Sequence, residues 1–449
     1  MSVASAVIGP SPSKLVIVVC SAQVLVQIGA FFWPALLPAM MPLWNLSNSE
    51  AGWITASFYG AYMMSVPVLV TLTDRVDPKR VYLFGVGSTV LGHLMFALLA
   101  EGFWSALILR ALTGMGWAGT YMTGLKLLAD RVDARMMSRA TAGHAASIGI
   151  SGALSFACGD LIATAAGWRA AFLAASVSAA VAWLLVAVIV PAQSKRATST
   201  KDGQGLYDFR PVFRNSSAMA YAIAYCIHTL EMSALRGWGV AFLGYVATTT
   251  GASAATLLSP AIVATGLGLI GTFSSVAGNE AAIRFGRKRL IVTAMLASIL
   301  IGATIGFVGS TSYGLSAALL TVYGIVIWLD SSSLTAGTVG TAEPSRRGAT
   351  LAVHSMLGYA GGFIGPLLVG WVLDLSGGMS QLGWGLSFLS VAVLMALSLV
   401  TFWAIRPREL EGDKAPVRRR TSSARFDQMR RRHHGGPVGT SLRSASTNI

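Results

Sequence analysis

Two short basic stretches, Asp74-Arg-Val-Asp-Pro-Lys-Arg80 and Arg284-Phe-Gly-Arg-Lys-Arg289, decide the fold of this 449-residue chain. Each follows one long apolar run and precedes another. Their first arginines lie 209 residues apart, and the same offset carries Gly149 and Gly152 onto Gly358 and Gly361. The agreement predicts an internal repeat of about half the chain.

Outward from these loops, the chain consists mostly of apolar runs of about 20 residues, the length that spans a bilayer as a helix. Only 11% of residues are charged and 54% are apolar, which excludes an ordinary soluble enzyme, a disordered protein and a disulfide-linked secreted domain. No run alternates as a β-barrel strand does. The expected spans are roughly 15–40, 52–73, 81–100, 104–128, 141–165, 170–190, 217–245, 256–279, 290–309, 314–341, 350–374 and 383–405.

The positions of the basic residues predict the orientation of these spans. With the N-terminus in the cytoplasm, all but four of the 33 Lys and Arg residues fall in cytoplasmic segments; the exceptions are Arg110, Lys126, Arg169 and Arg236. We therefore expect an all-α integral membrane protein with twelve spans and both termini inside. The membrane is a bacterial-type inner membrane or a plasma membrane.

The longest internal polar stretch divides the spans six and six. We expect a cytoplasmic segment 1–14, an N-terminal half 15–190, a cytoplasmic linker 191–216, a C-terminal half 217–405 and a disordered basic tail 406–449. Two six-span repeats in the same orientation are related by an axis along the membrane normal. The basic tail is expected to touch anionic lipid. Its charge alone also permits a nucleic-acid interpretation, but no base-stacking aromatic pattern accompanies it.

Several motifs resemble those of the major facilitator superfamily. The first basic loop resembles the family's Gly-x3-Asp-Arg-x-Gly-x-Arg/Lys-Arg/Lys motif, although Val70 and Asp77 replace its glycines. The second copy keeps the glycine but not the acid. The family's Arg-x3-Gly-x-Gly motif of span four matches Arg110-Ala-Leu-Thr-Gly-Met-Gly116. The Gly-Pro of the family's antiporter motif is missing from 141–165, which weighs against proton-antiporting drug efflux.

The resemblance implies a monomeric secondary transporter whose central cavity is lined by spans one, four, seven and ten. It also implies gating or structural roles for the residues at the matched positions. These residues are Asp74, Arg75, Arg80, Arg110, Gly114, Arg284, Gly286 and Arg287.

Ionisable side chains inside spans are costly and mark functional sites. Lys126, Arg236, Glu231 and Asp330 lie on spans that the family uses for its cavity. We expect the substrate to contact Gln23, Gln27, Tyr121, Lys126, Arg236 and Thr335, with Gln27 facing Arg236 through the repeat. We expect Asp330, Glu231 or His228 to carry a coupling proton. A structural salt bridge of Glu231, interfacial snorkelling of Lys126 and simple packing of His228 remain open alternatives.

Aromatic residues of these spans, such as Phe31 and Trp328, are expected to pack between helices. No nucleophile–base spacing, metal-ligand spacing or phosphate-binding loop stands out, so we expect no enzyme, no cofactor and no metal. The predicted function is proton-coupled symport of a small organic anion. The alternatives are efflux of a hydrophobic or cationic drug, and a transporter-like receptor that binds without transport.

Overall fold

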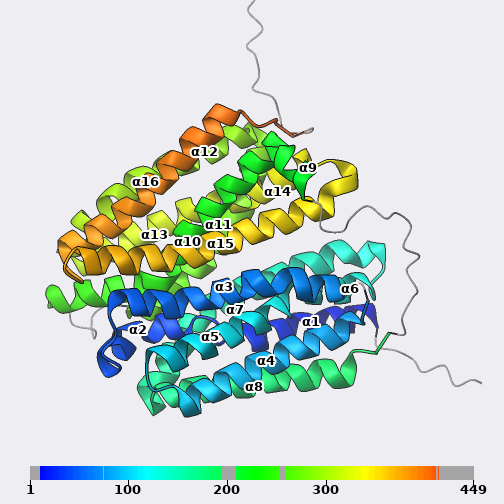
Figure 1. Cartoon of the computed structure of the whole chain (residues 1–449), viewed down its shortest axis with the longest axis horizontal. Helices are drawn as coiled ribbons and strands as arrows, with labels where there is room; N and C mark the ends of the chain where they lie inside the picture. The colour runs from blue at the N-terminus through cyan, green and yellow to red at the C-terminus, as the bar shows by residue number, and fades with distance from the viewer. Residues whose placement is uncertain (1–10, 74, 194–208, 252–257, 411–412, 414–449) are drawn as a thin grey trace, which may run out of the picture. The chain divides into compact units, whose positions relative to one another are not determined.

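A computed structural model describes residues 11–73, 75–193, 209–251, 258–410 and 413 (Figure 1). In these residues the regular structure is helical, and no strand is present. The N-terminal half contains α1 (Pro12–Gln27), α2 (Phe32–Leu43), α3 (Asn48–Leu72), α4 (Pro78–Leu99), α5 (Phe103–Ala118), α6 (Tyr121–Ala129), α7 (Ala134–Ala166) and α8 (Trp168–Ile189).

A short helix, α9 (Arg210–Arg214), leads into the C-terminal half. That half contains α10 (Ser216–Thr249), α11 (Pro260–Phe285), α12 (Arg287–Val308), α13 (Tyr313–Leu329), α14 (Ser331–Thr341), α15 (Arg347–Leu375) and α16 (Gln381–Ile405). Three expected spans are broken helices: α1–α2, α5–α6 and α13–α14. Span seven is the unbroken α10.

Ten helical segments among the described residues are long and apolar enough to cross a membrane. The two expected spans outside this set are α5–α6 and α10, which contain the embedded charges at Arg110, Lys126, Glu231 and Arg236. The charges lower the mean hydropathy of these segments, and the break divides α5–α6 into two shorter helices. The count of twelve spans and the orientation of the termini stay predictions.

Local sequence explains where the helices begin and end. Ser47 and Glu50 form a capping box at the start of α3, and Asp77 caps α4 directly before Pro78. Gly286 separates α11 from α12 with φ +103°, a conformation that side chains rarely adopt. Both basic loops are therefore tight connections between two long helices, as expected for corresponding loops of an internal repeat.

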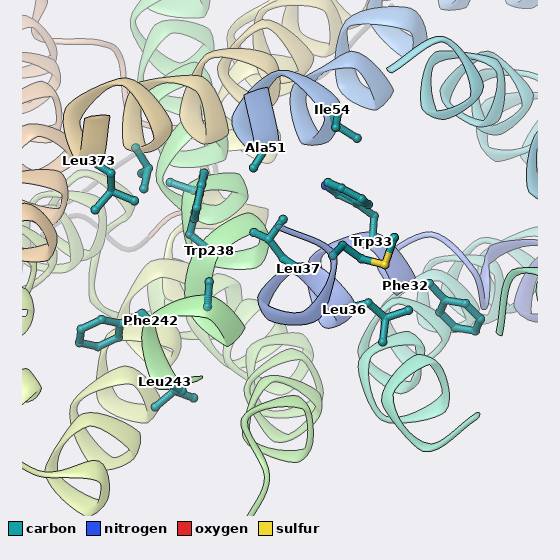
Figure 2. Packing of buried hydrophobic residues seen from close by; sticks show 14 of the residues in the cluster. Phe32, Trp33, Leu36, Leu37, Ala51, Ile54, Trp238, Phe242, Leu243 and Leu373 are labelled. Carbon is teal, nitrogen blue, oxygen red and sulfur yellow. The ribbon is translucent and has the colours of Figure 1, made fainter. Parts of the chain in front are cut away.

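The two halves meet through α3 against α15, α7 against α11 and α2 against α10. Figure 1 shows α3 and α15 running side by side. A buried apolar cluster joins the halves at the end of the bundle away from the basic loops. Figure 2 shows Leu37 of α2 lying between Trp33 of the same helix and Trp238 of α10. At this end the halves therefore share one core.

Residues that follow α16 belong to the C-terminal half. The hydroxyl of Tyr221 donates to the carbonyl of Arg408 at 2.9 Å, and the Arg408 N–H donates to Ser217 at 3.1 Å. The compact unit extends to Asp413. The expected tail boundary at 406 thus falls too early for residues 406–410 and 413, and the remaining tail residues lie outside the described ones.

Candidate functional site

Arg236 lines a pocket with a cavity volume of about 30 Å³ at the contact between the halves. Its walls come from α7, α10, α11 and α13, and they are apolar apart from this guanidinium; they include Phe156, Met232, Leu267 and Trp328. A single cation in an apolar recess attracts an anion whose body is apolar.

The guanidinium of Arg236 is held by aromatic rings. Its central carbon lies 5.0 Å from the ring centre of Phe31 in the N-terminal half and 4.6 Å from that of Trp328 in the C-terminal half. Tyr59 lies within hydrogen-bonding reach. Two contacts of this guanidinium are thus cation–π contacts and one is polar, and a guanidinium in such surroundings can bind a carboxylate through two parallel hydrogen bonds.

His228 and Asp330 form a buried pair. Nδ1 of His228 lies 2.9 Å from Oδ1 of Asp330, and the side chains are 1% and 4% exposed. The distance is that of an ion pair, but neither atom has hydrogen-bond geometry. Asp330 itself occupies the break between α13 and α14. Two of the three expected proton-coupling residues are therefore brought together across two helices.

Glu231, the third expected proton-coupling residue, lies elsewhere in the C-terminal half. Its Oε1 accepts hydrogen bonds from the hydroxyls of Ser298 on α12 and Tyr323 on α13, the latter at 2.6 Å. It borders a separate cavity with Trp384. Glu231 has hydroxyl partners here, and none of the ion pairs found among the described residues includes it.

Thr335 and Tyr121 each hold a histidine rather than lining the Arg236 pocket. Nε2 of His354 lies 3.2 Å from the Thr335 hydroxyl, and the His354 ring stacks on Tyr225 at 4.0 Å. Nε2 of His144 lies 2.9 Å from the carbonyl oxygen of Tyr121. Tyr225 also stacks on His228 at 5.6 Å, so the rings of His354 and Tyr225 connect Thr335 to His228.

The glutamines do not face Arg236. Gln23 donates to Gln27 at 3.2 Å, and the hydroxyl of Tyr82 donates to Gln23 at 3.4 Å. Gln27 lines a cavity enclosed by residues of the N-terminal half, among them His93. The expected opposition of Gln27 and Arg236 is wrong, because matched positions in a repeat need not share the same rotation about their helix axes. Lys126 is half-buried on α6.

The span-four motif lies inside the N-terminal half. Arg110 is 2% exposed, donates to the carbonyl of Ala30 at 3.1 Å and stacks over Phe58 at 4.7 Å. A Cβ on Gly114 would lie 2.1 Å from the carbonyl oxygen of Phe58. The motif thus fixes α5 against α3 and against the connection between α1 and α2, within one half.

The first basic loop is tied to its own half. Asp77 accepts from Arg131 at 2.7 Å and from the Gln193 N–H at 2.8 Å. Burial raises the pKa of the Asp77 carboxyl, but hydrogen bonds from Arg131 and the N–H groups of Gln193 and Lys79 outweigh burial and lower it. Arg75 and Arg80 are exposed, and Asp74 lies outside the described residues.

The second basic loop binds the segment after α16. Arg287 is 2% exposed and holds both carboxylate oxygens of Asp413 at 3.0 Å, while Nη1 donates to Asn279 and to the carbonyl of Ser333. Arg284 makes an exposed contact with Glu280. The two basic loops therefore differ in the ion pair that each forms. The first loop supplies the acid, Asp77, and the second loop supplies the arginine, Arg287.

Metal ligands are not gathered anywhere in the described part of the chain. No group of three or more His, Cys, Asp or Glu side chains is placed to hold an ion there. Cys20, Cys158 and Cys226 are free thiols on separate helices.

Comparison with known proteins identifies the class. The sequence profile of the Major Facilitator Superfamily matches residues 19–328 and 225–442. The chain therefore belongs to this superfamily of membrane transporters, and it is a multi-pass integral membrane protein and not an enzyme.

Particular relatives are more distant. Human Protein spinster homolog 1 is 26% identical over 246 residues, which are 53% of this chain and 47% of the human protein. The chain thus matches about half the length of this relative. A bacterial homolog of the human lysosomal transporter Spinster, solved in an inward-facing and occupied conformation, has a TM-score of 0.72 at 14% identity. It covers 91% of this chain and 100% of its own.

The nucleoside transporter NupG has a TM-score of 0.71 at 14% identity over 88% of this chain and 100% of its own. At these identities the solved structures establish the fold alone. The residues around Arg236 are therefore interpreted from their own contacts.

Phe31 and Trp328 were missed as site residues by sequence reasoning. Both were expected only to pack, yet both hold the guanidinium of Arg236. In the structure, each lies next to the break of a broken span, which the apolar pattern does not reveal.

Proposed function

We propose that the chain is a secondary active transporter that works by alternating access and moves a proton together with a small organic anion of apolar body. The observation that carries the proposal is Arg236, the single charged residue of an otherwise apolar pocket among the described residues. A desolvated guanidinium binds a carboxylate through two parallel hydrogen bonds.

The pair His228–Asp330 supports the proton. The carboxylate and the imidazole lie 2.9 Å apart and are both buried, so one added proton would change the net charge of this pair by one. Arg236 lies on α10, the helix that carries His228. Binding of an anion near Arg236 and of a proton near His228 compensate each other's charge, which favours movement of both together.

The same pocket disfavours the second candidate, efflux of a cationic drug. A fixed guanidinium repels a cation, and a desolvated cation beside it has no counter-charge among the residues that line the pocket. Orientation with both termini in the cytoplasm, in a bacterial-type inner membrane or a plasma membrane, is part of the proposal and rests on the basic loops.

The test begins with a thermal-shift screen of purified full-length protein against organic acids and cationic drugs. We expect an acid with an apolar body to raise the melting temperature. Proteoliposomes should then accumulate that acid when the outside is acidified.

Arg236→Lys should reduce its uptake by about tenfold or more, because an ammonium cannot copy the bidentate bond. Arg169→Lys is the matched control, since Arg169 also stacks on a tryptophan, at 4.5 Å, but is exposed. Uptake within about twofold of wild type in Arg236→Lys would make Arg236 structural. Binding without accumulation would indicate a receptor, and stabilisation by cationic drugs alone would indicate efflux.

A further inference from the structure

The helices α3 and α15 come from different halves and are packed with little space between their backbones. A Cβ on Gly52 would lie 2.8 Å from the carbonyl oxygen of Pro366, and one on Gly370 would lie 2.5 Å from that of Asn48. The contact at Gly370 brings the last turns of α15 against the first turn of α3. This is the end of the bundle away from the basic loops.

At that end, Asp374 of α15 binds the N-terminus of α3. Its Oδ1 accepts from the N–H of Asn48 at 3.1 Å and from Nδ2 of the same residue at 2.8 Å, and its Oδ2 accepts from the N–H of Ser49 at 2.7 Å. The first N–H groups of a helix have no partner within it, and a carboxylate there is favoured by the helix dipole. One half thus satisfies backbone donors of the other.

The repeat provides a second contact of the same kind. Asp160 lies on α7, the fifth span of the N-terminal half, and accepts from the Ser259 hydroxyl at 3.3 Å. Ser259 caps α11, the second span of the C-terminal half. Below it, the N–H of Ala157 donates to Thr265 across the same helix pair at 3.0 Å.

We infer that Asp374 and Asp160 form two latches between the halves: in each, a carboxylate on the fifth span of one half holds the start of the second span of the other half. The inference rests on the proposed alternating-access function. Among the described residues, the Asp374 latch makes three hydrogen bonds and the Asp160 latch makes one. Asp374 therefore contributes most to keeping this end closed.

The chemistry makes each latch a two-state element. When the halves separate, Asp374 gains water and so do the N–H groups of Asn48 and Ser49, so neither state leaves buried donors unpaired. The capping box of Ser47 and Glu50 stays within α3 and keeps the helix start folded in both states. The latch thus changes which state is favoured and leaves the helix intact.

The experiment measures distances by spin labels in full-length protein whose native cysteines are replaced by serine. One label pair, at Leu43 of α2 and Leu382 of α16, reports the latched end; both side chains are 57% exposed. The other pair, at Phe84 of α4 and Phe285 of α11, reports the basic-loop end. The variants are Asp374→Asn, Asp374→Ala and Asp160→Asn, with Glu50→Gln as the control that alters the same helix start within one half.

For Asp374→Asn, the ratio of long to short distances at the latched end should rise about tenfold, which corresponds to about 1.4 kcal/mol. The basic-loop pair should shift to shorter distances. Asp160→Asn should give a smaller shift in the same direction, and Glu50→Gln none.

Wild-type distances in Asp374→Asn, or an equal shift in Glu50→Gln, would overturn the inference. Asp374→Asn is nearly isosteric, so it is informative even where Asp374→Ala fails to fold. The distance measurement needs no substrate. A negative result here is therefore distinguishable from a negative result for Arg236→Lys in the uptake assay.

Discussion

Nδ1 of His228 on α10 lies 2.9 Å from Oδ1 of Asp330, which occupies the break between α13 and α14. The contact joins an unbroken helix to a broken one inside the C-terminal half. A change in the protonation of Asp330 would change the charge at this helix break. The backbone hydrogen bonds of the helix are already interrupted there, so a small movement of α14 relative to α13 would break few further hydrogen bonds.

Replacement of Asp330 tests the pair. Asp330→Asn should abolish accumulation of the identified anion driven by a pH gradient, because an amide cannot gain or release the proton. Exchange of anion for anion needs no net proton movement and should persist. Both are measured in proteoliposomes with radiolabelled anion.

Glu231→Gln is the companion variant, because Glu231 is equally buried but is hydrogen-bonded to Ser298 and Tyr323. We expect it to retain pH-driven accumulation. Full accumulation by both variants would exclude proton coupling through these acids and leave a uniporter or another coupling ion.

The Asp77–Arg131 contact gives a pH prediction for stability. The folded-state pKa of Asp77 is lowered, so its stabilising contribution is complete above the unfolded value of 3.8 and is lost as pH falls through the folded value. Asp77→Asn should lower the free energy of unfolding by about 1–3 kcal/mol, equally at pH 6 and pH 8. Thermal melting across this range checks it.

Asp130→Asn is the control, because Asp130 is the exposed neighbour in the next loop. It should change stability little. If the deficit of Asp77→Asn grew or vanished between pH 6 and pH 8, the pair would be titrating in the working range, contrary to the direction of its pKa shift.

The contact of Arg287 with Asp413 predicts where the chain can be shortened. A protein ending at Asp413 should melt like the full chain. One ending at Ile405 should lose about 3–5 kcal/mol, because it leaves the buried guanidinium of Arg287 without its carboxylate. Glu409→Gln should matter little, since its contact with Lys288 is 3.9 Å and more than a third exposed. Equal melting of the two truncated proteins would contradict the role of Asp413.

Gly361 on α15 tests helix packing within the C-terminal half. A Cβ there would lie 1.9 Å from the carbonyl oxygen of Cys226 on α10. Gly361→Ala should therefore destabilise the protein by about 1–3 kcal/mol. Gly348→Ala on the same helix meets nothing within 4 Å and should be neutral or stabilising. Similar melting temperatures for both variants would refute the close approach of α10 and α15.

Apolar runs and the repeat predicted the helices well, because membrane spans are set by hydropathy over many residues. The run expected at about 141–165, for example, is α7 (Ala134–Ala166). The break between α1 and α2 was not predicted, because hydropathy is continuous through it and tertiary contacts decide where a helix opens.

Side-chain contacts were harder to predict. The offset of 209 set Gln27 against Arg236, but a rotation of one residue turns a side chain by about 100° and removes such a contact. Asp374 and Asp413 were not singled out, since the first resembles an ordinary acid at the end of a span and the second an ordinary acid of a charged tail. Their partners come from distant parts of the chain, and no local pattern reports that.

α10 is unbroken from Ser216 to Thr249, although three other spans are interrupted. His228 and Arg236 are eight residues apart on it, which is about 12 Å along the axis. A rigid rod cannot tilt at one of these positions without displacing the other. Under the proposed symport, this helix would couple the two binding events mechanically: a ligand that binds at one position would displace the other position. A flexible residue inserted between positions 228 and 236 would then remove the coupling.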